Sequence, residues 1–507
     1  MKKPAYKWIA LSVTTVGSLM AAIDSTIVVL GLPSMLQDLH SDLVRMVWVI
    51  MGYLLVTTVL MLIFGRMADM FGRVKLYNLG FAIFTIGSVL CGLSPTDTVL
   101  IAMRVVQGLG GAMLASNAIA IITEAFPEEQ RGQAMGFNAI TWGGGSVLGP
   151  VLGGFILSIA SWRWIFLVNL PIGILGTLAA FFLLHDIAPN PKGERFDIPG
   201  ALLFTAGLVC LLLGITQGIG PGWLSPSILS LFAAAIVALV AFLFWEQRAK
   251  YPMLDLRLFG IRRYAFSVLA AMLQALAVFA VQFLLIFYFQ GVRGYSPLTA
   301  AFLILPLPVV MAILGPFGGR LADHVGGVIP ATLGLVAQCA ALLLLMLLTP
   351  TTPYLELAAA LALMGVGSGL FWPANTSTTM SSAPPNRLGV AAATLNTIRN
   401  VGTIFSFAVA LAVTAASMPP VLVNEVFLGT VGHLPASISA VFTNGMSHAF
   451  LASVAICAVA ILCSIVRGGG TPSGRARPLV NAQTAADQGS EPAPSERPKA
   501  EAGRAGD

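Results

Sequence analysis

Long apolar runs, separated by short polar segments, cover most of the 507 residues of this chain. Each run is about 20 residues long, the length that an α-helix needs to cross the hydrocarbon core of a membrane. The runs are continuous and lack the alternation of apolar and polar residues that marks the strands of a membrane β-barrel. We therefore predict an all-α integral membrane protein with fourteen transmembrane helices. The predicted helices are residues 8–31, 46–65, 76–94, 98–123, 135–160, 164–184, 198–217, 226–246, 264–290, 298–318, 328–348, 354–376, 390–414 and 447–467.

A charged segment between the second and third predicted helices is repeated later in the chain. Residues 65–75 (GRMADMFGRVK) contain the pattern G-R-x-A-D-x-x-G, which returns at residues 319–326, 254 positions later. An internal repeat indicates a fold built from two related halves. Both copies should lie at the same membrane surface, because Lys and Arg collect in short cytoplasmic loops. At about 30 residues for each helix and its loop, the spacing corresponds to about eight helices. This predicts two halves of six helices with a pair of helices inserted between them.

The predicted helices and the repeat divide the chain into four parts. Residues 1–184 form an N-terminal six-helix bundle, and residues 264–467 form a C-terminal one. Residues 185–263 hold the two inserted helices with their cytoplasmic linkers. Residues 468–507 are rich in Pro, Ala, Ser and charged side chains and lack the apolar residues that build a core, so we expect a disordered cytoplasmic tail.

The composition excludes a soluble globular protein. Hydrophobic residues make up 57% of the chain and charged residues 9%, and the mean hydropathy is +0.88. The net charge of +6 does not indicate a nucleic-acid partner, because the basic residues are scattered over loops. Most of them lie on the side that carries both termini, which predicts cytoplasmic termini and a location in the cell membrane. The five cysteines lie inside apolar runs, where we expect no disulfide, metal or cofactor.

Three ionisable residues lie inside predicted helices: Asp24, Arg104 and Arg399. A charge in this position costs several kcal/mol, so each is a candidate functional residue. Asp24 and Arg104 both lie roughly 10–12 Å from the outer membrane surface, so the two side chains could meet. Such a pair could act as a proton-dependent switch, or it could simply tie two helices together. Arg399, near mid-membrane, could favour an anionic or zwitterionic substrate, or it could be a packed structural arginine.

Two polar residues and a glycine run extend the set of candidates. Gln107 and Asn117 could contact a substrate or form plain interhelical hydrogen bonds. The fifth predicted helix contains GGGSVLGPVLGG at residues 143–154, and a run of glycines around a proline supplies a bend and a flat face for another helix. The residues of this run that we single out are Gly145, Gly149, Pro150, Gly153 and Gly154.

The charged segment at residues 65–75 also holds a carboxylate, which membrane topology alone does not require. Asp69 could cap a neighbouring helix and pair with Arg73, which would make a latch that exists in one conformation only. Gly65 and Gly72 complete this motif. In the second copy Asp323 corresponds to Asp69, but no basic residue stands in the place of Arg73.

Several of these motifs resemble those of a known family, the major facilitator superfamily. Residues 65–75 are similar to its loop 2–3 motif, Arg104 with Gln107 to its fourth-helix motif, and residues 145–154 to the fifth-helix motif of its antiporters. Further stretches resemble the fourteen-helix drug:proton antiporter branch. These stretches are DSTIV at 24–28 with Leu32 and Pro33, WIFxxNxP at 164–171, PMLDL at 252–256, and YFQG at 288–291 followed by GYSP at 294–297.

The resemblance implies two six-helix bundles that rock about a substrate cavity between them. It also implies a proton-coupled exporter of amphipathic or hydrophobic small molecules, in which Asp24 binds the proton and Arg104 senses it. The expected partners are a small-molecule substrate, protons and the lipid bilayer, and we expect a monomer. A transporter of a specific metabolite, working as importer or exporter, remains an alternative, and a membrane sensor is a more distant one. We expect no enzymatic activity, because no metal-ligand cluster or nucleophile–base spacing appears.

Overall fold

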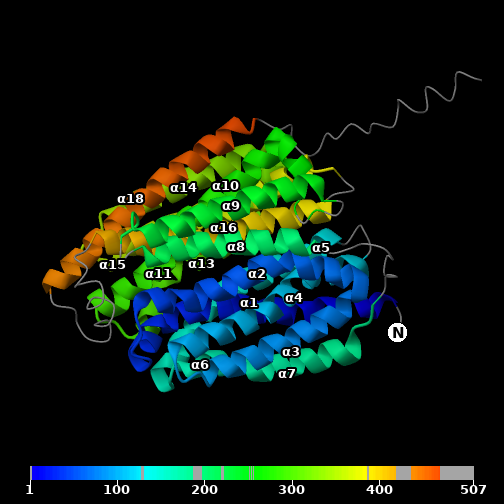
Figure 1. Cartoon of the computed structure of the whole chain (residues 1–507), viewed down its shortest axis with the longest axis horizontal. Coiled ribbons are helices and arrows are strands. Elements are labelled where there is room, and N and C mark those ends of the chain that lie inside the picture. The colour runs from blue at the N-terminus through cyan, green and yellow to red at the C-terminus, as the bar shows by residue number, and fades with distance from the viewer. Residues whose placement is uncertain are drawn as a thin grey trace, which may run out of the picture.

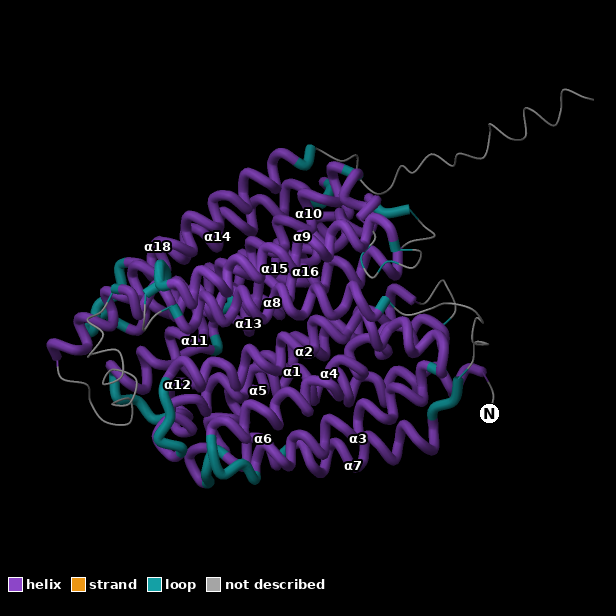
Figure 2. Tube along the Cα trace, viewed as in Figure 1, coloured by secondary structure: helices purple, strands orange, loops and turns teal. Residues whose placement is uncertain are grey.

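The computed structural model describes residues 3–126, 131–186, 197–218, 222–249, 252, 254, 256–384, 388–417 and 436–468. These residues form helices and loops only (Figure 2). The described part contains thirteen helices that are long and apolar enough to cross a membrane, and a shorter apolar stretch, Gly144–Ile159, within the helix α5. The predicted all-helical membrane fold is therefore confirmed. The predicted tail lies outside the described residues, except for Gly468.

The helices run side by side along the long axis of the molecule (Figure 1). Those of the first half are α1 (Lys3–Asp38), α2 (Leu43–Phe71), α3 (Arg73–Gly92), α4 (Asp97–Ala125), α5 (Arg131–Ile159), α6 (Arg163–Leu167) and α7 (Asn169–Leu183). The inserted pair is α8 (Ile198–Gln217) and α9 (Pro226–Arg248). Those of the second half are α10 (Arg262–Val278), α11 (Ala280–Phe287), α12 (Pro297–Ile304), α13 (Pro306–Val325), α14 (Val328–Met346), α15 (Tyr354–Ser382), α16 (Leu388–Ala416) and α18 (Ala436–Val466). A 3-10 helix, Leu256–Gly260, precedes α10, and a π-helical turn, Tyr288–Val292, follows α11.

Equivalent glycines make the same helix crossing in both halves. A β-carbon at Gly110 on α4 would lie 2.7 Å from the carbonyl oxygen of Gly80 on α3. A β-carbon at Gly367 on α15 would lie 2.6 Å from the carbonyl oxygen of Gly334 on α14. Gly80 and Gly334 are 254 positions apart, which is the spacing of the repeated motif. The repeat in sequence therefore corresponds to a repeat in packing.

The turn after the repeated motif also needs glycine twice. Gly72 joins α2 to α3 with a φ of 107°, and Gly326 ends α13 with a φ of 83°. Residues with a β-carbon rarely adopt this region, whereas glycine enters it without a steric penalty. These two positions are also 254 apart.

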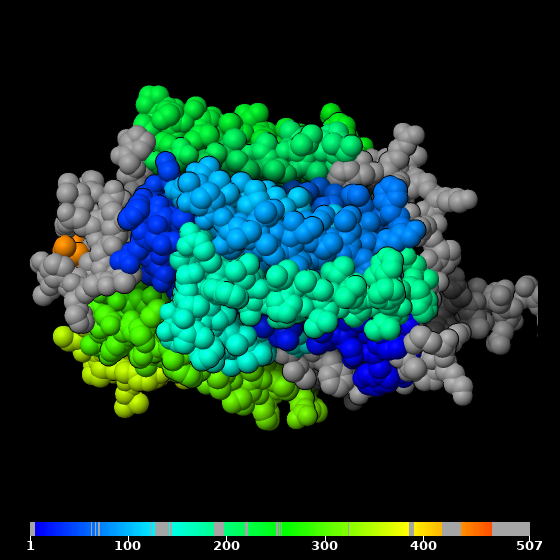
Figure 3. Space-filling model, turned by 90° about the horizontal axis from the view of Figure 1, so that it is seen from below, coloured from blue at the N-terminus to red at the C-terminus, as the bar shows by residue number. Residues whose placement is uncertain are grey.

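The inserted pair α8–α9 covers the seam between the halves, because α8 packs against both α2 and α16. Trp245 Nε1 on α9 donates to Asp197 Oδ1, the N-cap of α8, at 2.6 Å and ties the two helices together. Figure 3 looks onto the first half and shows the pair in green along one edge, with helices of the second half in yellow-green along the opposite edge.

Large apolar side chains cover the outer surface of the molecule. On α7, Leu175 is 68% exposed, Phe181 66% and Phe182 74%. Side chains of this kind are stable at a surface that faces lipid. The exposed apolar surface therefore agrees with a protein that crosses the membrane many times.

The last helix is longer than the sequence pattern predicted. The predicted helices 390–414 and 447–467 leave residues 415–446 as a loop between them, but α16 continues to Ala416 and α18 begins at Ala436. Phe442 and Met446 lie one turn apart on α18 and are almost fully buried. Their burial explains why the helix extends beyond the apolar run. Residues 418–435 lie outside the described part.

Candidate functional site

A buried ion pair lies inside the first half. Arg104 Nη1 on α4 donates to Asp24 Oδ2 on α1 at 2.7 Å, and the two side chains are 1% and 0% exposed. The structure thus brings together the two charged residues whose depth in the membrane indicated that they could meet. A buried ion pair adds little net stability, because both charges lose their contact with water. Stabilisation of the fold alone is therefore a weak explanation for it.

Two amide side chains complete the surroundings of the Asp24 carboxylate. Gln107 Nε2 donates to Asp24 Oδ1 at 2.8 Å, and Asn169 Nδ2 on α7 donates to the same oxygen at 3.1 Å. Gln107 Oε1 accepts from Arg104 Nη1 at 2.6 Å. Asp24 thus accepts three hydrogen bonds, as an ionised carboxylate does. Protonation would disturb this arrangement, because a neutral carboxyl group carries a donor of its own.

Ser88 on α3 joins the two amides. Its hydroxyl accepts from Gln107 Nε2 at 3.2 Å and from Asn169 Nδ2 at 3.0 Å, and it donates to the carbonyl oxygen of Phe166 at 2.9 Å. Two accepted bonds and one donated bond use the full capacity of a hydroxyl group. Ser88 therefore fixes how both amides present their donors to Asp24.

The guanidinium of Arg104 also contacts α2 and α6. Its Nε donates to the carbonyl oxygen of Val49 at 2.9 Å. Its Cζ lies 4.3 Å from the ring centre of Tyr53 and 5.7 Å from that of Phe166, which are cation–π distances. The network around Asp24 therefore involves α1, α2, α3, α4, α6 and α7. A change of charge at Asp24 would therefore take place next to side chains that six helices hold in one network.

Gln107 belongs to this network, whereas two other candidates from the sequence, Asn117 and Arg399, lie apart from it. Asn117 is fully buried, and its Nδ2 donates to the carbonyl oxygen of Met113 in its own helix at 2.8 Å. Arg399 lies on α16 in the second half. Sequence reasoning did not identify Ser88 or Asn169 as site residues. The only signal for Asn169 was its place in the WIFxxNxP stretch.

The glycines of α5 bring this helix close to α1 beside Asp24. Gly145 faces Ala22, Gly149 faces Thr26 and Gly153 faces Ile27. Gly154 faces the second half instead, where a β-carbon would lie 2.8 Å from Leu298 Cα on α12. Pro150 stands inside the helix, between the glycines that contact α1. The run therefore joins the helix that carries Asp24 to the other half of the molecule.

A single methyl group on this face should impair packing. A β-carbon at Gly145 would lie 2.5 Å from Ala22 Cβ, so Gly145→Ala should lower the free energy of unfolding by about 1–3 kcal/mol through overpacking. Gly144→Ala is the matched control, because no atom lies within 4 Å of a β-carbon there. Thermal unfolding of the purified variants measures the difference. Equal stability of the two variants would contradict the close packing of α5 on α1.

The charged loop of the first half is held by residues from other helices. Arg73 Nη1 donates to Glu124 Oε1 on α4 at 2.6 Å, and the amide of Val74 donates to Asp186 Oδ1 at 2.8 Å. Gly65 lies against Ser116 of α4. The side chain of Asp69 is outside the described residues, so its predicted role stays a prediction.

The corresponding loop of the second half is held by a basic residue from the end of α18. Arg467 Nη1 donates to Asn375 Oδ1 at 2.7 Å, and its Nη2 donates to the carbonyl oxygen of Gly327 at 3.4 Å. Burial and, as a smaller effect, the nearby charge of Arg263 together lower the pKa of Arg467 to about 10. Arg467 thus brings a basic side chain to Gly327, the position that corresponds to Arg73 in the first motif. The side chain of Asp323 is outside the described residues.

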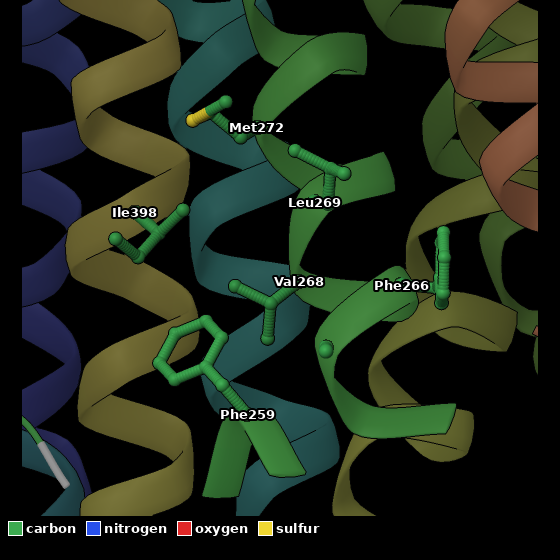
Figure 4. Close-up of a pocket in the computed structure, with 7 residues that line it drawn as sticks. Phe259, Phe266, Val268, Leu269, Met272 and Ile398 are labelled. Carbon is green, nitrogen blue, oxygen red and sulfur yellow. The ribbon is translucent and has the colours of Figure 1, made fainter. Parts of the chain in front are cut away.

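An apolar pocket of about 300 Å³ lies between α10 and α16 (Figure 4). It is lined by Phe259, Ala265, Phe266, Val268, Leu269, Met272 and Ile398. None of these side chains is polar, so the pocket can accommodate an apolar group but cannot hold a charge.

The family model and the related proteins that match this chain indicate the same family. Residues 14–407 match the model of the Major Facilitator Superfamily. The riboflavin transporter RibZ of Clostridioides difficile is 32% identical over 403 residues, which cover 79% of this chain and 87% of RibZ. The multidrug transporter protein MdtP of Bacillus subtilis is 32% identical over 422 residues, which cover 83% of this chain and 77% of MdtP.

The fold is also found among solved structures. A bacterial homolog of the human lysosomal transporter Spinster superposes with a TM-score of 0.63 at 17% identity, and the match covers 92% of this chain and 99% of that one. The family that the sequence motifs resembled is thereby confirmed, and it is a family of secondary transporters, not of enzymes. The chain belongs to the major facilitator superfamily.

Proposed function

We propose that this protein exports amphipathic or hydrophobic small molecules from the cell in exchange for protons that move inward. The observation that carries the proposal is the buried network in which Arg104, Gln107 and Asn169 all donate to Asp24. A titratable group enclosed by donors from several helices can exist in two arrangements, with and without a proton. A proton gradient can then bias the equilibrium between conformations.

The two states of Asp24 favour different contacts of Arg104. With Asp24 ionised, the ion pair at 2.7 Å holds α4 against α1. With Asp24 protonated, the charge of Arg104 loses its partner inside the membrane and must find another contact. The glycine-lined contact of α5 with α1 offers a path to the second half, since Gly154 on the same helix packs against α12. Alternating access would follow from the rocking of the halves.

The proposal includes the orientation of the protein in the membrane. Of the 27 Lys and Arg residues, Arg45, Arg163 and Arg293 lie on the side away from the termini, and Arg104 and Arg399 lie within helices. The predicted order of helices and loops puts the others on the side of the termini, which we place in the cytoplasm of the cell. Proton flow down its usual gradient would then drive molecules outward.

A metabolite transporter is the second candidate function. It is favoured by the similarity to RibZ, whose name describes a riboflavin transporter. The multidrug relative favours export of diverse compounds. The two candidate functions differ in the number of compounds that the protein transports: one metabolite, or many lipophilic compounds.

Transport measurements in inside-out membrane vesicles test both candidate functions. The vesicles are acidified inside by respiration, and a pH-sensitive dye follows the gradient while single lipophilic compounds or riboflavin are added. We expect several lipophilic compounds to dissipate part of the gradient in vesicles that contain the protein, and no such response in vesicles from cells that lack it. A response to one metabolite alone would favour the second candidate. No response to any compound would contradict proton-coupled export.

A further inference from the structure

A polar stripe runs along the middle of α16. Arg399 and Asn400 lie three and four residues after Asn396, and Thr403 lies four and three residues after them, so all four share one face of the helix. Thr403 is buried, and the other three are half-buried. Polar side chains inside a membrane face a bundle interior or a water-filled path rather than lipid. The stripe therefore marks a polar surface within the second half.

Arg399 provides the charge of this stripe. Its Nη2 donates to Asn400 Oδ1 at 3.3 Å, and its Cζ lies 5.4 Å from the ring centre of Trp372 on α15. None of the ion pairs found among the described residues includes Arg399. The contacts of its guanidinium are thus an amide oxygen and an aromatic ring, both neutral.

Arg104 and Arg399, the two arginines predicted to lie inside membrane helices, differ in the charge of their partners. Arg104 has the carboxylate of Asp24 at 2.7 Å, whereas Arg399 has no carboxylate partner in the described part of the chain. A charged side chain at the centre of a membrane helix is costly. A cation–π contact offsets only part of this cost. An anion supplied from outside the chain would complete the site.

We propose that the transported molecule carries an anionic group on an aromatic body, and that Arg399 binds this group while Trp372 packs against the body. A guanidinium presents planar donors that suit carboxylate, sulfonate and phosphate groups. The side-chain amides of Asn396 and Asn400 lie on the same face as further donors. The inference rests on the proposed transport function and names the chemical class of its substrate.

The test uses two fluorescent probes with the same aromatic body. These are 8-anilinonaphthalene-1-sulfonate, which is anionic, and its neutral parent N-phenyl-1-naphthylamine. Binding to the purified full-length protein in detergent is measured without a pH gradient, so the result does not depend on coupling or direction. We expect the wild type to bind the sulfonate more tightly than the parent. Arg399→Gln should weaken sulfonate binding by about tenfold or more and leave binding of the parent unchanged.

Two further variants keep the test decisive. Arg399→Lys retains the charge and should keep part of the preference for the sulfonate, which separates charge recognition from a loss of folding. Trp372→Leu should weaken binding of both probes, because it removes the aromatic contact. Equal binding of the two probes to the wild type, or an equal effect of Arg399→Gln on both, would overturn the proposal. Failure of proton coupling in vesicles, with the sulfonate preference intact, would overturn the proposed function instead.

Discussion

Substrate-driven proton movement should disappear when Asp24 is replaced by asparagine. The amide has nearly the shape of the carboxylate but cannot take up or release a proton. In either orientation its Nδ2 would meet a donor: Arg104 Nη1 in the place of Oδ2, or Gln107 Nε2 and Asn169 Nδ2 in the place of Oδ1. We expect a loss of stability of about 1–3 kcal/mol from this mismatch, which is small enough for the protein to fold, and a complete loss of the dye response in inside-out vesicles.

Two control variants separate the proton from the fold. Asp24→Glu keeps a titratable group and should retain part of the response. Asp38→Asn removes a carboxylate at the end of the same helix, where Asp38 is half-exposed and pairs with Arg163 at 2.6 Å, and it should transport like the wild type. A normal response of Asp24→Asn at equal protein amount would show that Asp24 is structural.

Breaking the buried pair from its other side should have the largest effect on stability. Arg104→Gln leaves the Asp24 carboxylate without its counter-charge at a position that is 0% exposed. Removal of one partner of a buried ion pair typically lowers the free energy of unfolding by about 3–5 kcal/mol. Arg163→Gln at the exposed pair with Asp38 should cost about 1 kcal/mol or less. Denaturant or thermal unfolding of the purified variants measures both.

The double variant Asp24→Asn with Arg104→Gln tests whether the two side chains act as a unit. It removes both charges and leaves a neutral polar network, so it should be more stable than Arg104→Gln alone. It should nevertheless show no proton-coupled transport. Additive losses of stability would mean that the two residues are energetically independent, which contradicts the account.

The sequence was sufficient to identify the charges of the site because a charge inside an apolar run is conspicuous. Asp24 and Arg104 could be paired from their depth alone. Ser88 and Asn169 are small and polar, and many such residues occur in membrane helices without a function. Only the packing of α3 and α7 against α1 and α4 shows that these two side chains reach the carboxylate and its neighbours.

Contacts between segments that are distant in the chain could not be predicted from the sequence. The motif at residues 65–75 was recognisable, but nothing in its pattern predicts that Glu124 pairs with Arg73 or that Asp186 binds the amide of Val74. Arg467 is the last residue of the last predicted helix, and the sequence pattern gave no reason to connect it with Gly327. In each half, the side chain of a residue just after the last helix, Asp186 or Arg467, forms a hydrogen bond with the repeated loop.

The most direct test of the central claim is an infrared difference spectrum of the protein in lipid membranes, recorded between alkaline and acidic pH. Protonation of a buried carboxylate produces the C=O stretching band of a carboxylic acid. Exposed carboxyl groups contribute to this band as well, so the account predicts that the component from a carboxyl group shielded from water appears in the wild type and in Asp38→Asn and is absent from Asp24→Asn. An unchanged spectrum in Asp24→Asn would contradict the claim that Asp24 carries the proton.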